Sequence, residues 1–394
     1  MLNFTCTDRE LNDGFAWARE RALSFVHDED HVGPWYEAAL PGRESFCIRD
    51  VCHYANGAHV LGLERHTKNM LLRFVQSIAE SRDFCCFWEI DKNYRPTPCD
   101  YKSDSDFWYN LPANFDLIDA CLRMYKLTGD KDYIESEDFL HFYRLTLNQY
   151  IKKWDIDCDG IPEGAGGVRR GIPSYVEQRD RGAAQSLDLL AAEAAAFAAF
   201  AEICELRGEK GAAYRERASA IRAEIDARWD ESQKAYFFVK EKDGNLAHSP
   251  YGFEYVPYFG ASIDERKLNF NLERLNKWGL ENSLYVESRS HLSEIFYRYG
   301  KYDLAEDWLR RCTSADLRRR EYPEVAFACI GAFVFGLMGI TYDYVTKTVS
   351  ANPHLPSGVT SASLTGLPVF GKTANICVKN GVVSITYTDK REKE

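Results

Sequence analysis

The chain has 394 residues and a formal net charge of −11 at pH 7, and 45% of its residues are apolar. Such a chain can bury a large core and is too long for most single small domains. The acidic balance argues against a nucleic-acid partner, because phosphate binding needs a basic face and the densest basic run is only Arg318-Arg319-Arg320. Aromatic residues make up 14% of the chain, a surplus typical of pockets in which rings stack on a ligand.

The N-terminus carries neither a basic start nor a long apolar run, and no stretch of the chain is apolar enough for a transmembrane helix. Twelve cysteines are scattered through expected helices, as Cys121, Cys204 and Cys329 illustrate, which is typical of reduced thiols. We therefore expect a cytoplasmic protein with no membrane partner, although a trimmed secreted chain would also lack a signal. The oligomeric state is left open.

Helical periodicity dominates from Thr7 to about Gly339, and two kinds of stretch alternate along it. The amphipathic stretches cover residues 9–26, 65–80, 132–154, 210–229, 265–278 and 303–312. The more uniformly apolar stretches begin near Ile48, Pro112, Ala183, Tyr255, Ser290 and Pro323. An amphipathic helix covers one side of a core, whereas a helix that is apolar all round is buried on every side. The sequence therefore predicts an all-α fold, an (α/α)6 toroid of six helical hairpins.

The connections between these stretches differ in length. Short glycine-containing links, such as the one at Gly129, join an inner helix to the following outer helix. The links from outer to inner helices are long, at residues 81–111, 156–182 and 230–254. Long ordered loops gathered on one face of a fold are where functional sites are usually built.

After Gly339 the composition changes to segments rich in Val, Ile, Thr and Ser, at residues 345–349, 358–369 and 376–388. Asn380-Gly381 is a favoured two-residue hairpin turn between two of these segments. We expect a catalytic helical domain over residues 1–340 and a small C-terminal β segment over residues 341–394.

The long loops bring carboxylates and aromatic side chains together before each inner helix. The candidate site residues, in chain order, are Arg49, Asp50, His53, Trp88, Asp106, Trp108, Tyr109, Tyr175, Glu177, Glu287, Arg289, Glu321 and Glu324, with Glu254 held in reserve. Carboxylates that hydrogen-bond hydroxyl groups, beside rings that stack on sugar faces, are typical of a carbohydrate cleft.

On this pattern the chain resembles the six-hairpin glycosidases, the (α/α)6 superfamily of glucoamylases, trehalases and related enzymes, from about Thr7 to Gly339. The resemblance implies a general acid in the loop before the sixth helix, which points to Glu177, and a base before the twelfth, which points to Glu324 or Glu321. Ser174-Tyr175-Val-Glu177 is similar to a Thr-Tyr-Asp type motif of some members, but it has Ser for Thr and one additional residue before the acid.

The resemblance further implies that Arg49-Asp50 binds the terminal sugar and that catalysis inverts the anomeric centre. A closed toroid with long loops favours exo-action on an oligosaccharide. Further expected substrate contacts are His53, Trp88, Asp106, Trp108, Tyr109, Tyr175, Glu287 and Arg289. Glu287 is also a reserve catalytic candidate.

The same residues also have purely structural interpretations. Glu177 and Glu324 could cap or precede helices, Asp50 could pair with Arg49, and His53 and the rings could be ordinary core. Arginines 169, 170, 179 and 181 crowd the acid loop and could bind a uronic-acid carboxylate, or could be solvated loop charges.

Two other classes of function stay open. A polysaccharide lyase on the same toroid could use Tyr175 or His53 as base, with Asn110 or Arg49 neutralising a uronate carboxylate. A non-catalytic carbohydrate-binding protein would bind sugar without turnover.

The run from Asp155 to Gly160, Asp-Ile-Asp-Cys-Asp-Gly, resembles the start of a calcium loop, but Gly166 stands where the bidentate Glu is expected. A turn stabilised by Asp side chains is the favoured interpretation. The cysteines have no zinc spacing, and no phosphate loop, nucleotide fingerprint or Gly-x-Ser-x-Gly elbow is present. We therefore expect neither a metal nor a cofactor.

Overall fold

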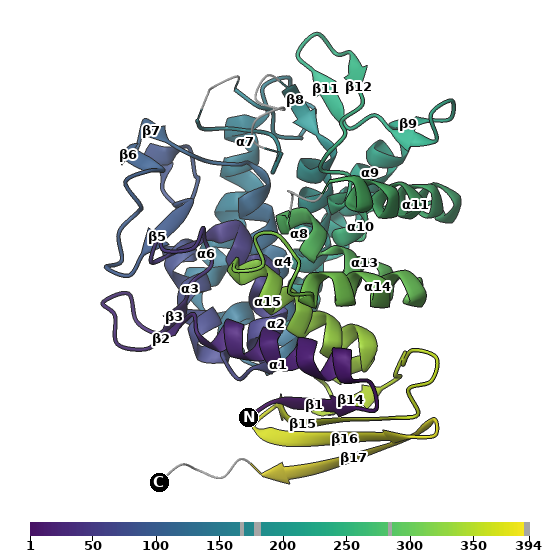
Figure 1. The fold of residues 1–394 in the computed structure, drawn as a ribbon. Helices are drawn as coiled ribbons and strands as arrows, with labels where there is room; N and C mark the ends of the chain where they lie inside the picture. The colour runs from purple at the N-terminus through teal and green to yellow at the C-terminus, as the bar shows by residue number, and fades with distance from the viewer. Residues whose placement is uncertain (166–168, 177–182, 283–285, 390–394) are drawn as a thin grey trace.

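The structure is a computed structural model of the whole chain, and it describes every residue except 166–168, 177–182, 283–285 and 390–394. About 47% of the chain is helical and 18% is in strands. The fold is a helical toroid with added β segments, so the expected all-α toroid with a small C-terminal β segment is met only in part (Figure 1).

Helices at the predicted outer positions are amphipathic and half-exposed. They are α1 (Arg9–Leu23), α3 (Glu64–Gln76), α5 to α7 with the π-helical turn η2 (Asp132–Glu135, Glu137–Leu145, Ile151–Trp154 and Thr146–Tyr150), α9 (Ala212–Ala227), α11 (Glu265–Glu281) and α14 (Tyr302–Thr313). Each buries a stripe of apolar residues against the helices inside it.

Helices at the predicted inner positions are buried on nearly every side. They are α2 (Ile48–Val60), α4 (Pro112–Thr128), α8 (Leu187–Leu206), the short α10 (Tyr255–Tyr258), α12 and α13 (Val286–Ser290 and Leu292–Arg298), and α15 with the π-helical turn η4 (Pro323–Gly331 and Ala332–Leu337). The predicted alternation of outer and inner helices is therefore present along the described chain.

Local chemistry sets several helix ends. The Asp8 and Asp264 side chains each accept a hydrogen bond from a backbone amide in the first turn, of α1 and α11 respectively. Pro112 and Pro323 occupy the first position of α4 and α15, where a missing N–H costs nothing. Gly129 ends α4 with φ at 72°, a left-handed conformation that favours glycine.

The C-terminal part of the chain forms strands, as predicted. They are β13 (Ile340–Asp343), β14 (Thr348–Ala351), β15 (Ser361–Val369), β16 (Lys372–Lys379) and β17 (Val382–Asp389). Asn380 and Gly381 connect β16 to β17 with φ at 48° and 78°, as the Asn-Gly hairpin signal predicts. The domain boundary near residue 340 stays a prediction.

One strand of this sheet comes from the other end of the chain. Strand β1 (Asn3–Cys6) pairs antiparallel with β15, so the strand order is β1-β15-β16-β17. The rings of Phe4 and Phe15 on β1 and α1 lie 5.6 Å apart, and both contact Phe333 in η4. Strand β1 therefore joins the sheet to the toroid, and the sequence analysis did not anticipate it.

The long loops on the other side of the toroid contain short strands. These are β2 (Val26–His27), β3 (Trp35–Tyr36), β4 (Ser45–Cys47), β5 (Glu89–Asp91), β6 (Tyr101–Ser103), β7 (Asp106–Phe107), β8 (Ala183–Ser186), β9 (Trp229–Asp230), β10 (Ala235–Tyr236), β11 (Val239–Glu241) and β12 (Leu246–Ala247), with the 3-10 turn η1 (Glu80–Arg82). They account for much of the strand content of the described residues. Among the described residues no helix is both long and apolar enough to cross a membrane.

Candidate active site

Three carboxylates lie at the starts of three inner helices. Asp50 is in the first turn of α2, Glu287 in the first turn of α12 and Glu324 in the first turn of α15. Asp50 and Glu324 are only 8% and 6% exposed. Negative charge on Asp50 and on Glu287 raises the pKa of Glu324, which places the three groups close enough to interact.

Glu324 is the most perturbed member of this carboxylate cluster. Burial, followed by the charges of Asp50 and Glu287, raises its pKa to about 8. The Tyr54 hydroxyl on α2 donates a hydrogen bond of 3.0 Å to Glu324 Oε2 and opposes that rise. The Tyr54 ring stacks on Phe327 of α15 with centroids 5.7 Å apart, which fixes the hydroxyl in place.

Two arginines partly compensate the negative charge. Arg49 Nε lies 2.9 Å from Asp50 Oδ1, and Arg319 Nη2 lies 2.7 Å from Glu287 Oε1. Burial nevertheless raises the pKa of Asp50, with Arg49 pulling it down and Glu287 pushing it up. The raised pKa values of Glu324 and Asp50, in a cluster with a third carboxylate, are typical of acid–base sites.

A buried polar centre adjoins the cluster. His53 Nε2 lies 2.8 Å from Asp116 Oδ2, and the Tyr175 hydroxyl donates a 3.0 Å hydrogen bond to the same oxygen. Burial raises the pKa of Asp116 to about 7 and, with the charge of Arg49, lowers the pKa of His53 well below its usual range. Burial therefore favours the neutral imidazole of His53 and shifts the Asp116 carboxyl towards its protonated form.

Aromatic rings from several inner elements surround His53. Its ring lies 4.8 Å from that of His291 and 4.9 Å from that of Tyr258. Tyr175 and Tyr255 lie 5.2 Å apart beside it. Side chains of α2, α10, the α12–α13 junction and the loop before α8 therefore meet at the middle of the toroid, where the inner helices converge.

The described part of the loop before α8 is anchored by a buried acid. Asp188 accepts hydrogen bonds from Ser174 Oγ at 2.9 Å and from the Tyr175 amide at 2.6 Å. The Arg49 guanidinium lies 5.9 Å from the Tyr175 ring centre and 6.0 Å from that of Trp88. Loops from two hairpins thus place an aromatic ring near one cation.

The structure brings together seven of the residues that the sequence analysis named. They are Arg49, Asp50, His53, Trp88, Tyr175, Glu287 and Glu324. It adds Tyr54, Asp116, Asp188, Tyr258 and His291, which were not singled out. A signal was available for the two aspartates, because each interrupts a strongly apolar helix.

Other candidates lie among different partners. Arg169 Nε lies 2.8 Å from Asp106 Oδ1, Trp108 Nε1 donates to Asn110 Oδ1 at 3.0 Å, and the fully buried Tyr109 hydroxyl donates to Asn114. The Arg289 guanidinium lies 5.2 Å from the centre of the Trp308 ring on the outer helix α14, and Glu321 is exposed. Their roles in binding or catalysis stay predictions, and Glu177 lies outside the described residues.

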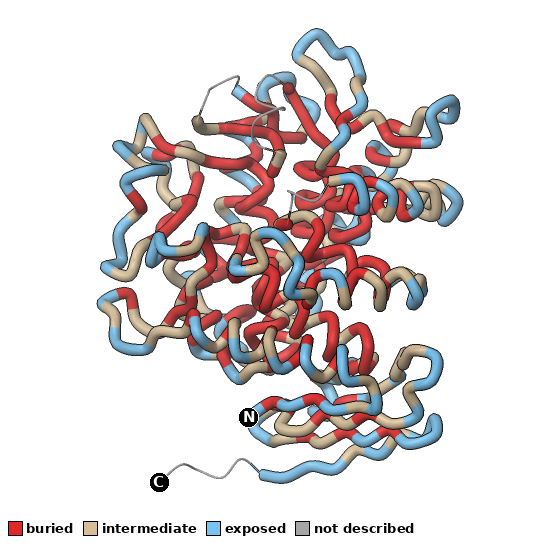
Figure 2. Tube along the Cα trace, in the orientation of Figure 1, coloured by how far each residue is buried: buried red, intermediate tan, exposed pale blue. Residues whose placement is uncertain are grey.

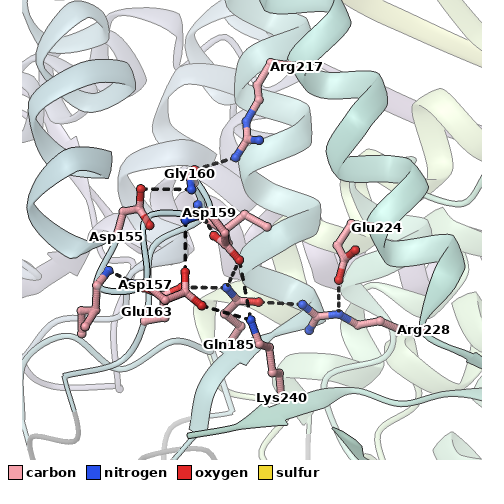
Figure 3. Close-up of polar contacts among 12 residues, drawn as sticks. Asp155, Asp157, Asp159, Gly160, Glu163, Gln185, Arg217, Glu224, Arg228 and Lys240 are labelled. Carbon is pink, nitrogen blue, oxygen red and sulfur yellow. Dashed lines mark hydrogen bonds and ion pairs between the residues drawn. The ribbon is translucent and has the colours of Figure 1, made fainter. Parts of the chain in front are cut away.

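The acidic run after α7 forms a compact turn (Figure 3). Its side chains accept backbone amides of the same turn: Asp155 accepts Gly160 N at 3.0 Å and Asp159 accepts Ile161 N at 2.7 Å. Lys240 Nζ lies 3.3 Å from Asp157 and 3.6 Å from Asp159, so a lysine supplies positive charge here. These contacts agree with the interpretation as an Asp-stabilised turn, although four carboxylate oxygens of Asp155, Asp157, Asp159 and Glu163 lie within 4.8 Å.

Comparison with known proteins finds similar solved structures but no similar sequence family. No family model and no curated protein sequence matches the chain. Among solved structures, the GH78 family rhamnosidase of Bacillus sp. GL1 matches 98% of the chain with a TM-score of 0.69 at 16% identity. The Streptomyces avermitilis alpha-L-rhamnosidase complexed with L-rhamnose matches 98% with a TM-score of 0.61 at 14% identity. The GH63 mannosylglycerate hydrolase from Thermus thermophilus, in complex with glucose, matches 80% with a TM-score of 0.55 at 13% identity.

The chain spans 41% and 37% of the two rhamnosidases, but 98% of the mannosylglycerate hydrolase. It therefore has the fold of the six-hairpin glycosidases, as the resemblance in sequence implied. Because all of these identities are low, the likeness extends to the fold alone.

Proposed function

We propose that this protein is a glycoside hydrolase on a complete (α/α)6 toroid, acting by inverting acid–base catalysis on an oligosaccharide end. One observation carries the proposal: Asp50, Glu287 and Glu324 lie in the first turns of three inner helices, and the charges of Asp50 and Glu287 act on the buried Glu324. Paired acids with perturbed pKa values beside stacking rings are what glycosidic bond hydrolysis requires.

Glu324 is the proposed general base. Its pKa of about 8 makes the ionised carboxylate a strong proton acceptor for an attacking water. Glu177 is the proposed general acid, because it follows the Ser174-Tyr175 segment that Asp188 holds beside Arg49. An inverting mechanism needs the two carboxyl groups about 6.5–9.5 Å apart, with the water between them.

Arg49 and Asp50 are the proposed ligands of the terminal sugar, with Trp88 and Tyr175 stacking on its ring. The burial and ring contacts of His53, Tyr258 and His291 at the centre of the inner helices support exo-action. All twelve cysteines are free thiols, which supports the cytoplasmic location that we expect.

We further propose that the substrate contains a uronic acid, and this hypothesis rests on the arginines of the acid loop. Arg169 and Arg170 are engaged by Asp106 at 2.8 Å and Asp83 at 2.7 Å, which weakens their availability for a substrate carboxylate. Arginines 179 and 181 lie outside the described residues. If Arg169→Ala and Arg179→Ala reduce turnover of neutral and uronate substrates equally, the hypothesis of a uronic-acid substrate is wrong.

The proposal is tested by reducing-sugar release over a panel of oligosaccharides, with wild type beside Glu177→Gln. We expect release by wild type and a fall of at least about 10²-fold in the variant, the lower range for a lost proton donor. Equal rates would remove Glu177 from the mechanism. New absorbance from an unsaturated product would instead identify a lyase, and sugar binding without any turnover would identify a non-catalytic binding protein.

A further inference from the structure

Strand β17 forms one end of the four-stranded sheet, and none of the described strands covers its outer side (Figure 1). It pairs with β16 over its whole length, from Val382 opposite Lys379 to Asp389 opposite Lys372, with no shift of register. Figure 2 shows that this edge is exposed. A long regular edge strand offers a row of backbone N–H and C=O groups to which another strand can bind.

The features that usually protect such an edge are missing from β17 before its last residue, Asp389. Residues 382–388 read Val-Val-Ser-Ile-Thr-Tyr-Thr and contain no charged residue, proline or glycine. Natural edge strands are commonly blunted by lysine, proline, a bulge or shortness. The opposite edge of the sheet is protected, because β1 has only four residues and packs against α1 through Phe4.

We propose that β17 is a dimerisation edge, which pairs antiparallel with β17 of a second copy and continues the sheet across both molecules. The proposal does not depend on the catalytic assignment, because β17 belongs to the C-terminal sheet and not to the carboxylate cluster.

The side-chain pattern of β17 is complementary to itself. With a two-fold axis at Ile385, that residue faces its own counterpart and Val383 faces Tyr387 of the second copy. All three are on the face of the sheet shared with Ile376 and Val378 of β16, which are buried. In the proposed dimer, apolar residues of one strand therefore lie opposite apolar residues of the other. Within residues 382–388, no charged residue lies opposite another charged residue.

Physical chemistry also bounds the strength of the dimer. Pairing through one strand edge buries less than the roughly 1,200 Å² of a standard interface, so the dimer is weak and reversible. Each copy carries a net charge of −11, and salt screens the repulsion between the copies. The dimer therefore tightens as ionic strength rises.

Sedimentation velocity of the full chain over about two decades of concentration tests the proposal. Two variants place lysine on β17: Ile385→Lys sets like charges directly opposite each other, and the exposed Thr386→Lys sets them diagonally while sparing the half-buried face. Leu246→Lys is the matched control, since it replaces an apolar residue that is 42% exposed on β12.

We expect a monomer–dimer equilibrium for wild type and for Leu246→Lys, with the dissociation constant raised at least about tenfold by each β17 variant. If Ile385→Lys fails to fold, Thr386→Lys decides alone. A wild-type monomer at every concentration overturns the proposal, as does a dimer that both variants leave intact. Open-ended growth beyond dimers, or assembly only with another protein's strand, overturns it as well.

Discussion

The hydroxyl of Tyr54 donates a 3.0 Å hydrogen bond to the Oε2 atom of Glu324, and it thereby joins the second helix of the chain to the last inner helix. These residues are 270 positions apart in sequence. The bond stabilises the ionised carboxylate in a place where burial and the charges of Asp50 and Glu287 favour the protonated form. Tyr54 therefore tunes the group that we propose as general base.

Replacing Tyr54 with Phe should move the pH dependence of hydrolysis. Loss of one hydrogen bond worth about 1 kcal/mol raises the pKa of Glu324 by about half a unit or more. If Glu324 is the base, the acidic limb of the kcat/KM profile shifts to higher pH by that amount. A shift of the alkaline limb would make Glu324 the acid, and an unchanged profile would remove it from the rate equation.

The protonation of Glu324 should also be visible in stability. Its pKa rises from 4.5 to about 8 on folding, so the unfolded chain loses a proton that the folded chain keeps, and folding weakens as pH rises between those values. Glu324→Gln should raise the free energy of unfolding at pH 8 by on the order of 4 kcal/mol, and by almost nothing near pH 4.

Urea unfolding at both pH values measures this difference. The exposed Glu321→Gln is the matched control and should show no pH-dependent gain. If Glu324→Gln is equally destabilised at both pH values, the carboxyl is held as an ion in the folded state, contrary to our account.

Asp116 should act as a positioning residue for His53 and Tyr175. In Asp116→Asn the side chain keeps its shape and one acceptor oxygen, but it can no longer ionise, and an NH2 group replaces its second oxygen beside His53 and Tyr175. We expect kcat/KM to fall roughly tenfold, equivalent to about 1.4 kcal/mol. Steady-state kinetics would show this, with Asp138→Asn on the exposed side of α6 as control. A fall of the same size in the control would indicate a general effect of the substitution.

The acidic turn of Asp157 and Asp159 should not need a metal ion. Lys240 lies within 3.3 Å and 3.6 Å of these carboxylates and supplies the positive charge. A chelator should therefore leave the thermal unfolding temperature of wild type unchanged. Lys240→Met should lower stability by about 0.5–1 kcal/mol, as expected for a partly exposed ion pair. Calcium-dependent stabilisation of wild type would show that the turn is a metal site after all.

The helical framework was predictable because it follows from local periodicity. Strongly apolar and amphipathic stretches alternate, so the inner and outer helices could be assigned from residue patterns alone. The Asn380-Gly381 hairpin was predictable for the same reason, since the turn chemistry is contained in two residues.

Strand β1 could not be predicted in that way, because its four residues have no pattern of their own and pair with β15 only through the tertiary fold. The candidate site shows the same limit. Arg49, Asp50 and Glu324 were found because they lie at the starts of apolar helices, whereas Asp116 and Tyr54 lie further along their helices. An acid within an apolar helix could have drawn attention to Asp116, but the partners of both residues depend on which helices face each other, and short-range patterns do not contain that information.

The most direct test of the account compares oligosaccharide hydrolysis by wild type, Glu324→Gln and the neighbouring Glu321→Gln, at pH 8 on the best substrate of the panel. Both variants make the same chemical change three residues apart, but only Glu324 is buried in the carboxylate cluster. We predict that Glu324→Gln lowers kcat by at least about 10²-fold and that Glu321→Gln changes it little. Full activity in Glu324→Gln would contradict the account.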